Sequence, residues 1–205
     1  MGIRGLARFA ALGVLFALAG CVTTAENSLS PGDIAGMKLT GVTVSFEPNA
    51  RVQWDDGFRA YSAGKAIPDD QMAAAWATPE ARTYVRTLLA SKIKAGLEEA
   101  MAGQLNGARP VRLEIVVKEF NMSSVIERVV IGSNNQMIAT ANLVDARTGA
   151  TILSDPDVQG FLPATGGIIG TAVGMAMDHA FAKSPGERLI EQYGRTYRDW
   201  LIRSA

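Results

Sequence analysis

The chain has 205 residues, enough for one domain with a substantial hydrophobic core or for two small domains. Its composition, with 48% hydrophobic and 20% charged residues, is ordinary for a globular protein and excludes an intrinsically disordered chain. The 20 Lys and Arg residues are scattered and balance the 20 Asp and Glu residues, which excludes a polycationic nucleic-acid-binding protein.

The first 21 residues are organised like a bacterial export signal. Arg4 and Arg8 form a positive region, residues 9–19 are apolar and uncharged, and the sequence LAGC ends at Cys21. This ending resembles the lipobox of bacterial lipoproteins, [LV]-[AST]-[GA]-C. The resemblance implies that residues 1–20 are removed as a signal peptide by a cut between Gly20 and Cys21. It also implies that the Cys21 thiol carries a diacylglyceryl group and that the new amine is acylated, for example with palmitate.

The residues around Cys21 indicate where the protein is held. Val22 follows it rather than Asp, and the resemblance to enterobacterial lipoproteins then implies a lipid anchor in the outer membrane, facing the periplasm. The inner membrane is the alternative, because this sorting rule varies among bacteria. Residues 21–36 are polar, small and turn-rich, and we interpret them as a lipidated flexible tether to a single periplasmic domain, residues 37–205.

The domain is predicted to begin with a strand that ends at Pro48–Asn49, because Val42, Val44 and Phe46 alternate with polar residues. Residues 49–77 follow, with aromatic residues among two acidic pairs, broken by Gly and Pro. They form either a ligand groove or, as we prefer, a loop that folds its aromatic side chains onto the core.

The clearest helix is predicted for residues 79–102. Thr78 offers a capping hydroxyl, Pro79 suits the first helical position, and Glu80 lies in the positive first turn. Gly103 is a plausible C-cap. Apart from Lys92, one face is apolar and is expected to pack on the core: Val85, Leu88, Leu89, Ile93, Leu97, Ala100 and Met101.

Residues 111–117 and 137–154 are predicted to form one sheet. In the first segment apolar and polar residues alternate, which is typical of a strand with one buried face. The second contains ANLVDARTGATIL, a hairpin in which Gly149 takes a positive φ. The buried face is expected to lie against the 79–102 helix and to consist of Val111, Leu113, Ile115 and Val117.

A terminal helix is predicted after the capping box Ser184–Glu187, which contains Pro185. Its apolar positions are Leu189, Ile190, Tyr193, Tyr197, Trp200 and Leu201. The order of elements predicts an α+β fold in which amphipathic helices pack on one face of a mainly antiparallel sheet.

The strand and hairpin at residues 110–155 give a second resemblance. Their V-x-[LI]-x-V pattern and D-A-x-T-G turn look like small periplasmic auxiliary lipoproteins. These include accessory lipoproteins of ABC-type and lipid-transport systems and distant relatives of the curli-assembly lipoprotein. The turn occurs in many unrelated hairpins, so the resemblance concerns architecture more than function.

A glycine zipper lies in ATGGIIGTAVGMAM, where Gly166, Gly170 and Gly174 recur every fourth residue. The spacing indicates close packing of a small-residue helix face, so we interpret the segment as a docking helix. A mobile loop is the alternative. A membrane span is disfavoured, since residues 164–177 would cover only about 21 Å of a roughly 30 Å hydrocarbon core.

No pattern in the sequence indicates catalysis, so we expect a non-enzyme without metal or cofactor other than the covalent lipid on Cys21. The single His, His179, is adjacent to Asp178, and side chains of neighbouring helical residues diverge by about 100°. Cys21 is the only Cys, which excludes an intramolecular disulfide.

Two functions fit these observations. The first is a non-catalytic accessory or scaffold subunit of an envelope assembly or transport system, which binds the bilayer through Cys21 and an envelope protein through its domain. The alternative is a structural lipoprotein that self-associates through the Gly-rich helix.

Overall fold

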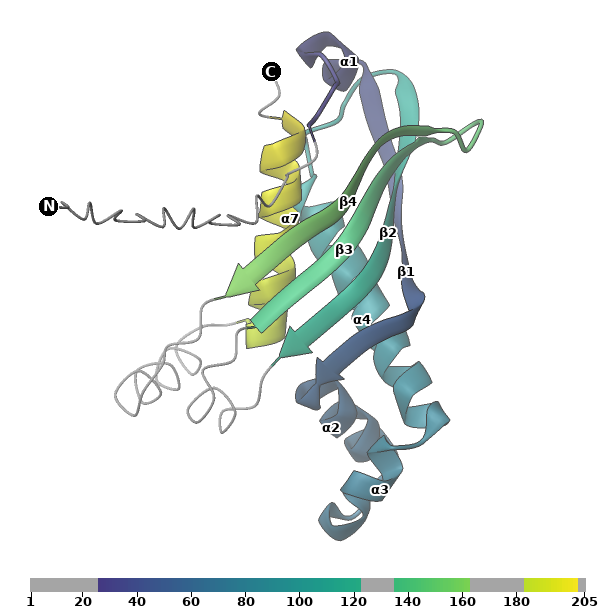
Figure 1. The fold of residues 1–205 in the computed structure, drawn as a ribbon, viewed down its shortest axis with the longest axis vertical. Coiled ribbons are helices and arrows are strands. Elements are labelled where there is room, and N and C mark those ends of the chain that lie inside the picture. Colours follow the sequence, from purple (N-terminus) through teal and green to yellow (C-terminus); the bar gives the residue numbers. More distant parts are fainter. Residues whose placement is uncertain (1–25, 123–134, 163–182, 203–205) are drawn as a thin grey trace, which may run out of the picture.

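A computed structural model describes residues 26–122, 135–162 and 183–202 of the chain. These residues form an α+β fold in which helices pack on one face of a four-stranded sheet of order β1-β2-β3-β4 (Figure 1). The predicted fold class is therefore confirmed. The elements are α1 (Pro31–Ala35), β1 (Met37–Trp54), α2 (Asp55–Gly64), η1 (Asp69–Gln71), α3 (Met72–Trp76), α4 (Pro79–Ala100), β2 (Arg109–Met122), β3 (Asn135–Asp145), β4 (Thr151–Leu162) and α7 (Pro185–Ile202).

The sheet is mainly antiparallel, as predicted. β2 pairs antiparallel with β3, and β3 with β4, whereas β1 and β2 run parallel. Parallel neighbours need a long crossover connection, and here α4 belongs to the segment that returns the chain from the end of β1 to the start of β2 (Figure 1).

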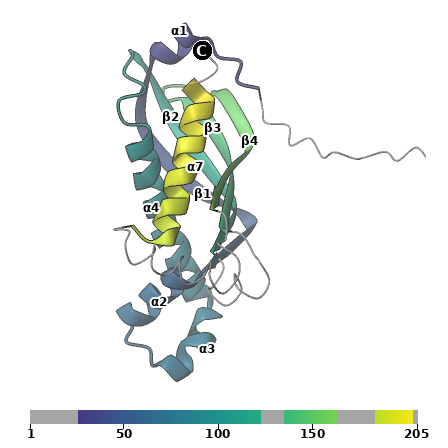
Figure 2. The same ribbon diagram turned by 90° about the vertical axis from the view of Figure 1, so that its left-hand side faces the viewer.

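α4 and α7 lie side by side on the same face of the sheet (Figure 2). α4 packs over β1, and α7 packs over β4 and part of β3. The buried face of β2 is the one predicted: Leu113 is 1% exposed, and Val111, Ile115 and Val117 are fully buried. They share one core cluster with the buried face of α4, made of Val85, Leu89, Ile93 and Leu97.

β1 is longer than the sequence indicated. We predicted that Pro48–Asn49 ends this strand, and that prediction is wrong, because β1 continues to Trp54. The pairing with β2 shifts register between Phe46 and Arg51. Pro48 therefore lies in an irregularity of an edge strand, where its missing N–H breaks no ladder bond.

The prediction of a loop for residues 49–77 is also wrong, since most of this segment is the end of β1 followed by α2, η1 and α3. Its aromatic residues do pack inward: Trp54 and Tyr61 are buried, and the rings of Phe58 and Trp76 stack at 5.4 Å. The Trp76 Nε1 donates a hydrogen bond to the Ser62 hydroxyl at 2.8 Å, which ties α3 to α2.

The predicted N-caps of both helices and the predicted turn are confirmed, whereas the predicted C-cap at Gly103 is wrong, because α4 ends at Ala100 and its C-cap is Met101. The Thr78 hydroxyl accepts a hydrogen bond from the Ala81 N–H at 3.2 Å at the start of α4. At the start of α7, the Ser184 N–H donates to the Glu187 carboxylate, and the Glu187 N–H donates to the Ser184 hydroxyl. The β3–β4 turn closes with Gly149 at φ +73°.

Residues 26–36, the second half of the predicted tether, contact the domain. The Asn27 side chain donates to the Leu201 carbonyl oxygen at 2.8 Å, at the end of α7. Ile34 in α1 is 5% exposed, and the Gly36 carbonyl accepts hydrogen bonds from the Ala108 and Arg109 N–H groups. The chain is thus fastened to the domain from Asn27 onward.

Candidate functional site

The closest approach between α4 and α7 depends on glycines. A Cβ on Gly96 would lie 2.6 Å from the Ile190 Cγ2, and a Cβ on Gly194 would lie 2.9 Å from the Ala100 Cβ. Since real Cβ atoms essentially never come so near, any side chain at these positions would force the facing side chains or the helices themselves to shift. We call this contact, formed by Gly96, Ala100, Ile190 and Gly194, the helix seam.

A groove of about 380 Å³ lies along the helix seam. Small and aliphatic residues from both helices line it together with long charged side chains. The lining residues are Lys92, Ala95, Gly96, Glu99, Lys183, Glu187, Ile190 and Glu191.

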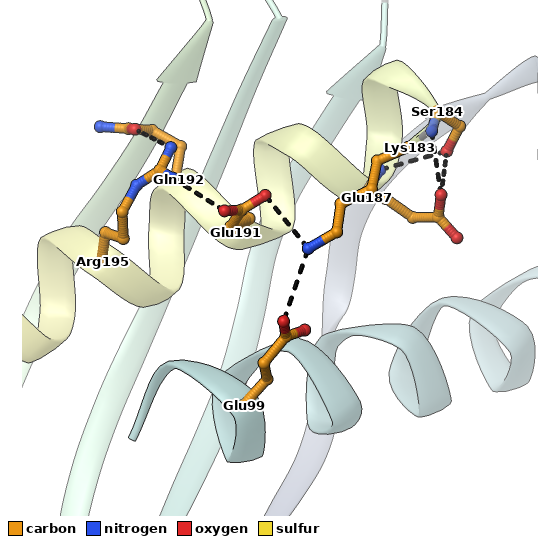
Figure 3. Close-up of polar contacts among 7 residues, drawn as sticks. All are labelled: Glu99, Lys183, Ser184, Glu187, Glu191, Gln192 and Arg195. Atoms are coloured by element: carbon orange, nitrogen blue, oxygen red, sulfur yellow. Dashed lines mark hydrogen bonds and ion pairs between the residues drawn. The ribbon is translucent and has the colours of Figure 1, made fainter. Parts of the chain in front are cut away.

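The charges in this groove are paired across the helices. The Lys92 ammonium lies 2.8 Å from the Glu187 carboxylate. Lys183, just before α7, lies between Glu99 of α4 and Glu191 of α7, at 3.5 Å from each (Figure 3). Glu191 also pairs with Arg195 at 2.8 Å, one turn further along α7. The ion pairs thus join α4 to α7 above the helix seam.

This pairing shifts the pKa of two groups in the groove, Glu187 and Lys183. Hydrogen bonds from the Lys92 ammonium and the Ser184 N–H lower the pKa of Glu187 to about 2, although partial burial opposes this. The charges of Glu191 and Glu99 raise the pKa of Lys183. Near neutral pH Glu187 is therefore ionised and Lys183 protonated, a state suited to charge complementarity rather than to proton transfer, which needs a pKa near the working pH.

A second group of polar atoms is buried beneath α7. Tyr193 and Tyr197 lie in the core, and neither hydroxyl has a hydrogen-bond partner within the described residues. Burial raises the pKa of both phenols, and the nearby charge of Asp155 raises it further. Both hydroxyls are thus neutral at physiological pH and contribute packing and dipoles only.

The residues that the sequence singled out do not meet in this groove. Gly20, Cys21, Gly166, Gly170, Gly174, Asp178 and His179 lie outside the described residues, so those hypotheses stay predictions. The acidic pair Asp69–Asp70 is exposed and does not line the α4–α7 groove. Phe58, from the segment for which a ligand groove was the alternative, lines a separate hollow beside Val52 and Arg86.

The described residues contain neither a metal-ligand cluster nor a helix suited to cross a membrane. Across residues 26–122, 135–162 and 183–202, no group of three His, Cys, Asp or Glu side chains is placed to hold a metal ion. In the same part of the chain, no helix has the length and apolarity that a membrane crossing requires.

Sequence reasoning missed the helix seam, although a signal for it was present. Gly96 stands inside a long helix, where glycine costs about 1 kcal/mol relative to alanine, so a packing reason was to be expected. Lys92 was noted only as a break in the apolar face of the 79–102 helix. Its partner Glu187 is 95 residues away, and one sequence does not reveal that pairing.

The part of the chain that builds the groove is also the part that matches a known family. The model of a family of unknown function, DUF6778, matches residues 82–203, which run from the first turns of α4 through β2, β3 and β4 to the end of α7. The chain belongs to this family. The helix seam and its ion pairs thus lie inside the family's own region, whereas α1, β1, α2 and α3 precede it.

Comparison with curated proteins finds no match. Solved structures give distant likenesses. A PelC dodecamer from Paraburkholderia phytofirmans is 12% identical, with 87% of this chain and 95% of that chain covered and a TM-score of 0.38. A Xanthomonas campestris protein of the DUF330 family model is 12% identical, with 88% of this chain and 91% of that chain covered and a TM-score of 0.40. The lipoprotein GNA1162 of Neisseria meningitidis is 17% identical, with 71% of this chain and 97% of that chain covered and a TM-score of 0.27.

Proposed function

We propose that this member of DUF6778 is a lipid-anchored periplasmic protein that serves as a non-catalytic accessory or scaffold subunit of a cell-envelope assembly or transport system. The lipid is carried by Cys21, and the anchor lies in the outer membrane. The observation that carries the proposal is the complete LAGC sequence, which follows a positive region and an apolar stretch of signal-peptide length.

The structure supports an anchored role through the start of the fold. Asn27 is hydrogen-bonded to the end of α7 only six residues after Cys21. Two or three acyl chains on one residue hold a protein stably on a bilayer, since each buried methylene contributes about 0.8 kcal/mol. A stable anchor joined to the domain by so short a connection suits a subunit that works at the membrane surface.

The α4–α7 groove supports a binding role for the domain. It presents fixed charges of both signs beside small apolar residues. Paired charges at the rim of an interface favour a specific partner by complementarity more than they add affinity. We therefore assign the groove and its rim to contact with an envelope protein.

Substitution of Cys21 tests the anchor. In Cys21→Ser the acceptor thiol is lost, so the protein should accumulate as uncleaved precursor and its mature form should disappear from the membrane fraction. Cell fractionation followed by immunoblotting measures both. A mature protein of unchanged size in the membrane fraction of this variant would contradict lipid anchoring at Cys21.

Charge reversal in the groove tests the partner. Proteins crosslinked to the chain in cells are identified by mass spectrometry, and the experiment is repeated with Lys183→Glu and with Lys94→Glu as the matched control on the outer side of α4. The proposal expects one envelope protein to be captured by the native chain and by Lys94→Glu, and to be lost with Lys183→Glu. Equal capture by both variants would remove the groove from the proposal.

The second candidate function is self-assembly through the predicted glycine zipper at Gly166, Gly170 and Gly174. The observation that supports self-assembly is the four-residue spacing of these glycines in the sequence. The native mass of the protein without its lipid separates the two functions, because a monomer favours the accessory subunit. In an oligomer, Gly170→Leu should reduce the mass to that of a monomer.

A further inference from the structure

The two ends of the domain are set apart by β1. This strand of 18 residues begins next to α1 and ends next to α2 (Figure 1). At about 3.3 Å per residue it spans roughly 55 Å. We call residues 27–38, 105–110, 145–150 and 198–202 the α1 end, and residues 55–80 the α2–α3 end.

Hydrogen bonds and pairing hold the parts of the α1 end together. Asn27 donates to the carbonyl oxygens of Leu201 and Trp200, and its own side-chain oxygen accepts from the Leu29 N–H. The β3–β4 turn joins the same end, because the Ala146 N–H donates to the Pro110 carbonyl at 3.0 Å. The first residue of β1, Met37, pairs with Arg109. The N-terminal connection thus meets the domain at one defined end.

The connection from the lipid to this end is short. Asn27 is the sixth residue after Cys21, so six residue steps join the two. Even fully extended they span about 20 Å, since the chain advances by at most 3.3–3.6 Å per residue. The acyl chains lie below a headgroup layer roughly 5–8 Å thick, so Asn27 stays within about 15 Å of the membrane surface. That reach is much shorter than the roughly 55 Å between the two ends.

The two ends of the domain also differ in net charge. The α2–α3 end carries five carboxylates and two cationic side chains, a net charge of −3. The α1 end carries four cations and three carboxylates, a net charge of +1, which the exposed Glu26 just before it reduces to 0. Its cations are Lys38, Arg109, Arg147 and Arg198. Because anionic headgroups repel carboxylates within a Debye length, they disfavour the acidic α2–α3 end more than the α1 end.

We infer that the α1 end is the membrane-facing surface of the domain and that its partner is the headgroup layer of an anionic bilayer, with β1 standing away from the membrane and the α2–α3 end pointing into the periplasm. This inference rests on the proposed lipidation of Cys21. It places the groove between α4 and α7 along the side of a standing domain, where a periplasmic protein reaches it.

Three labelled variants of the full lipidated protein test the orientation. Cysteines replace Ala150 at the α1 end, Ser91 midway along α4, and Ala73 in α3, all of which are exposed. A maleimide fluorophore then reacts only at the new thiol, because the lipid occupies the thiol of Cys21. Each variant is bound to phosphatidylcholine–phosphatidylglycerol vesicles that contain lipids with nitroxide headgroups, and quenching is measured.

The inference predicts strongest quenching at position 150, weaker quenching at 91, and a loss of quenching to background at 73. Equal quenching at all three positions would mean that the domain lies on its side, and stronger quenching at 73 would mean that it stands inverted. Either result overturns the inference while leaving the lipid anchor intact. If the purified chain does not bind vesicles at all, the proposed anchor itself fails.

A longer connection separates the effect of tether length from other causes. Inserting 20 Gly and Ser residues between Ala25 and Glu26 adds a flexible coil of roughly 25 Å root-mean-square length. Vesicle binding should be unchanged, whereas quenching at position 150 should fall. Unchanged quenching at 150 would overturn the claim that the short connection holds this end against the membrane.

Discussion

The two faces of the sheet differ although the same strands build both. On the face beneath α4 and α7, Leu113, Val117 and Ala139 are at most 1% exposed and belong to one apolar cluster. On the opposite face, alternate residues of the same strands form polar pairs such as Lys118 with Asp157 and Ser154 with Asn142. Since side chains of a strand alternate between faces, one strand can bury the side chains of one face and expose those of the other to solvent. What distinguishes the faces is which of them the helices cover.

Reversing this difference at one position should have the largest effect. Leu113→Asp places a carboxylate in the core, where an unpaired charge costs several kcal/mol, comparable to a typical total stability of about 5–15 kcal/mol. We expect the variant to be unfolded at 25 °C by circular dichroism. Glu114→Gln, on the open face of the same strand, removes only an ion pair with Arg112 and should cost at most about 1 kcal/mol. Similar losses from the two changes would show that the faces are wrongly assigned.

The next effect concerns how closely the helices cover the face. In Gly96→Leu the new Cβ would lie 2.6 Å from the Ile190 Cγ2, so Ile190 or the two helices must shift to make room for the leucine. We expect a loss of about 1–3 kcal/mol in the free energy of unfolding, measured by urea denaturation. Ala95→Leu is the control, because Ala95 is the exposed neighbour on the same helix. A stable Gly96→Leu variant would refute the role given to the helix seam.

A smaller loss is expected where the N-terminal segment fastens α7. Asn27→Ala removes the donor to the Leu201 carbonyl, which lies in the last turn of α7, where carbonyl oxygens generally need partners from outside the helix. The cost should be about 1 kcal/mol, with faster amide hydrogen exchange in the last turn of α7. Ser28 is the next residue and is exposed, so Ser28→Ala should change neither the free energy of unfolding nor the amide exchange in α7. Unaltered exchange in Asn27→Ala would mean that this contact does not hold the segment.

The smallest effect is a dependence on pH from the ion pair between the helices. The pKa of Glu187 falls from its ordinary 4.5 to about 2 in the folded state, because Lys92 and the Ser184 N–H bond its carboxylate. A lowered pKa contributes stability above pH 4.5 that is lost as the pH falls from about 4.5 to about 2. The side chain is 39% exposed, so solvent screening limits this contribution to about 0.5–1 kcal/mol. Urea midpoints across this range should fall less in Glu187→Gln than in the native chain, and parallel curves would contradict the assignment.

Local signals account for what the sequence predicted correctly. The caps at Thr78 and Ser184 and the turn at Gly149 each involve partners within four residues, so their chemistry is visible in a short stretch. The burial of Leu113 follows from strand alternation alone.

Contacts between distant segments account for what was missed. The parallel pairing of β1 with β2 and the contact of Lys92 with Glu187 depend on where the chain returns after long connections. For α2, Asp55 and Asp56 in its first turn were a usable signal, yet Gly57 and the irregular residues after Gly64 concealed the helical pattern. The α4–α7 groove was missed for the same reason, since its two walls lie far apart in the sequence, with 95 residues from Lys92 to Glu187.

Mass spectrometry of the mature N-terminus tests the central claim most directly. The protein is extracted from bacterial membranes and digested, and the N-terminal peptide is sequenced. If the account is correct, this peptide begins at Cys21, lacks residues 1–20, and carries the mass of a diacylglyceryl group on the thiol. An unmodified Cys21 thiol, or a peptide that begins at an earlier residue, would contradict the lipid anchor and the orientation that depends on it.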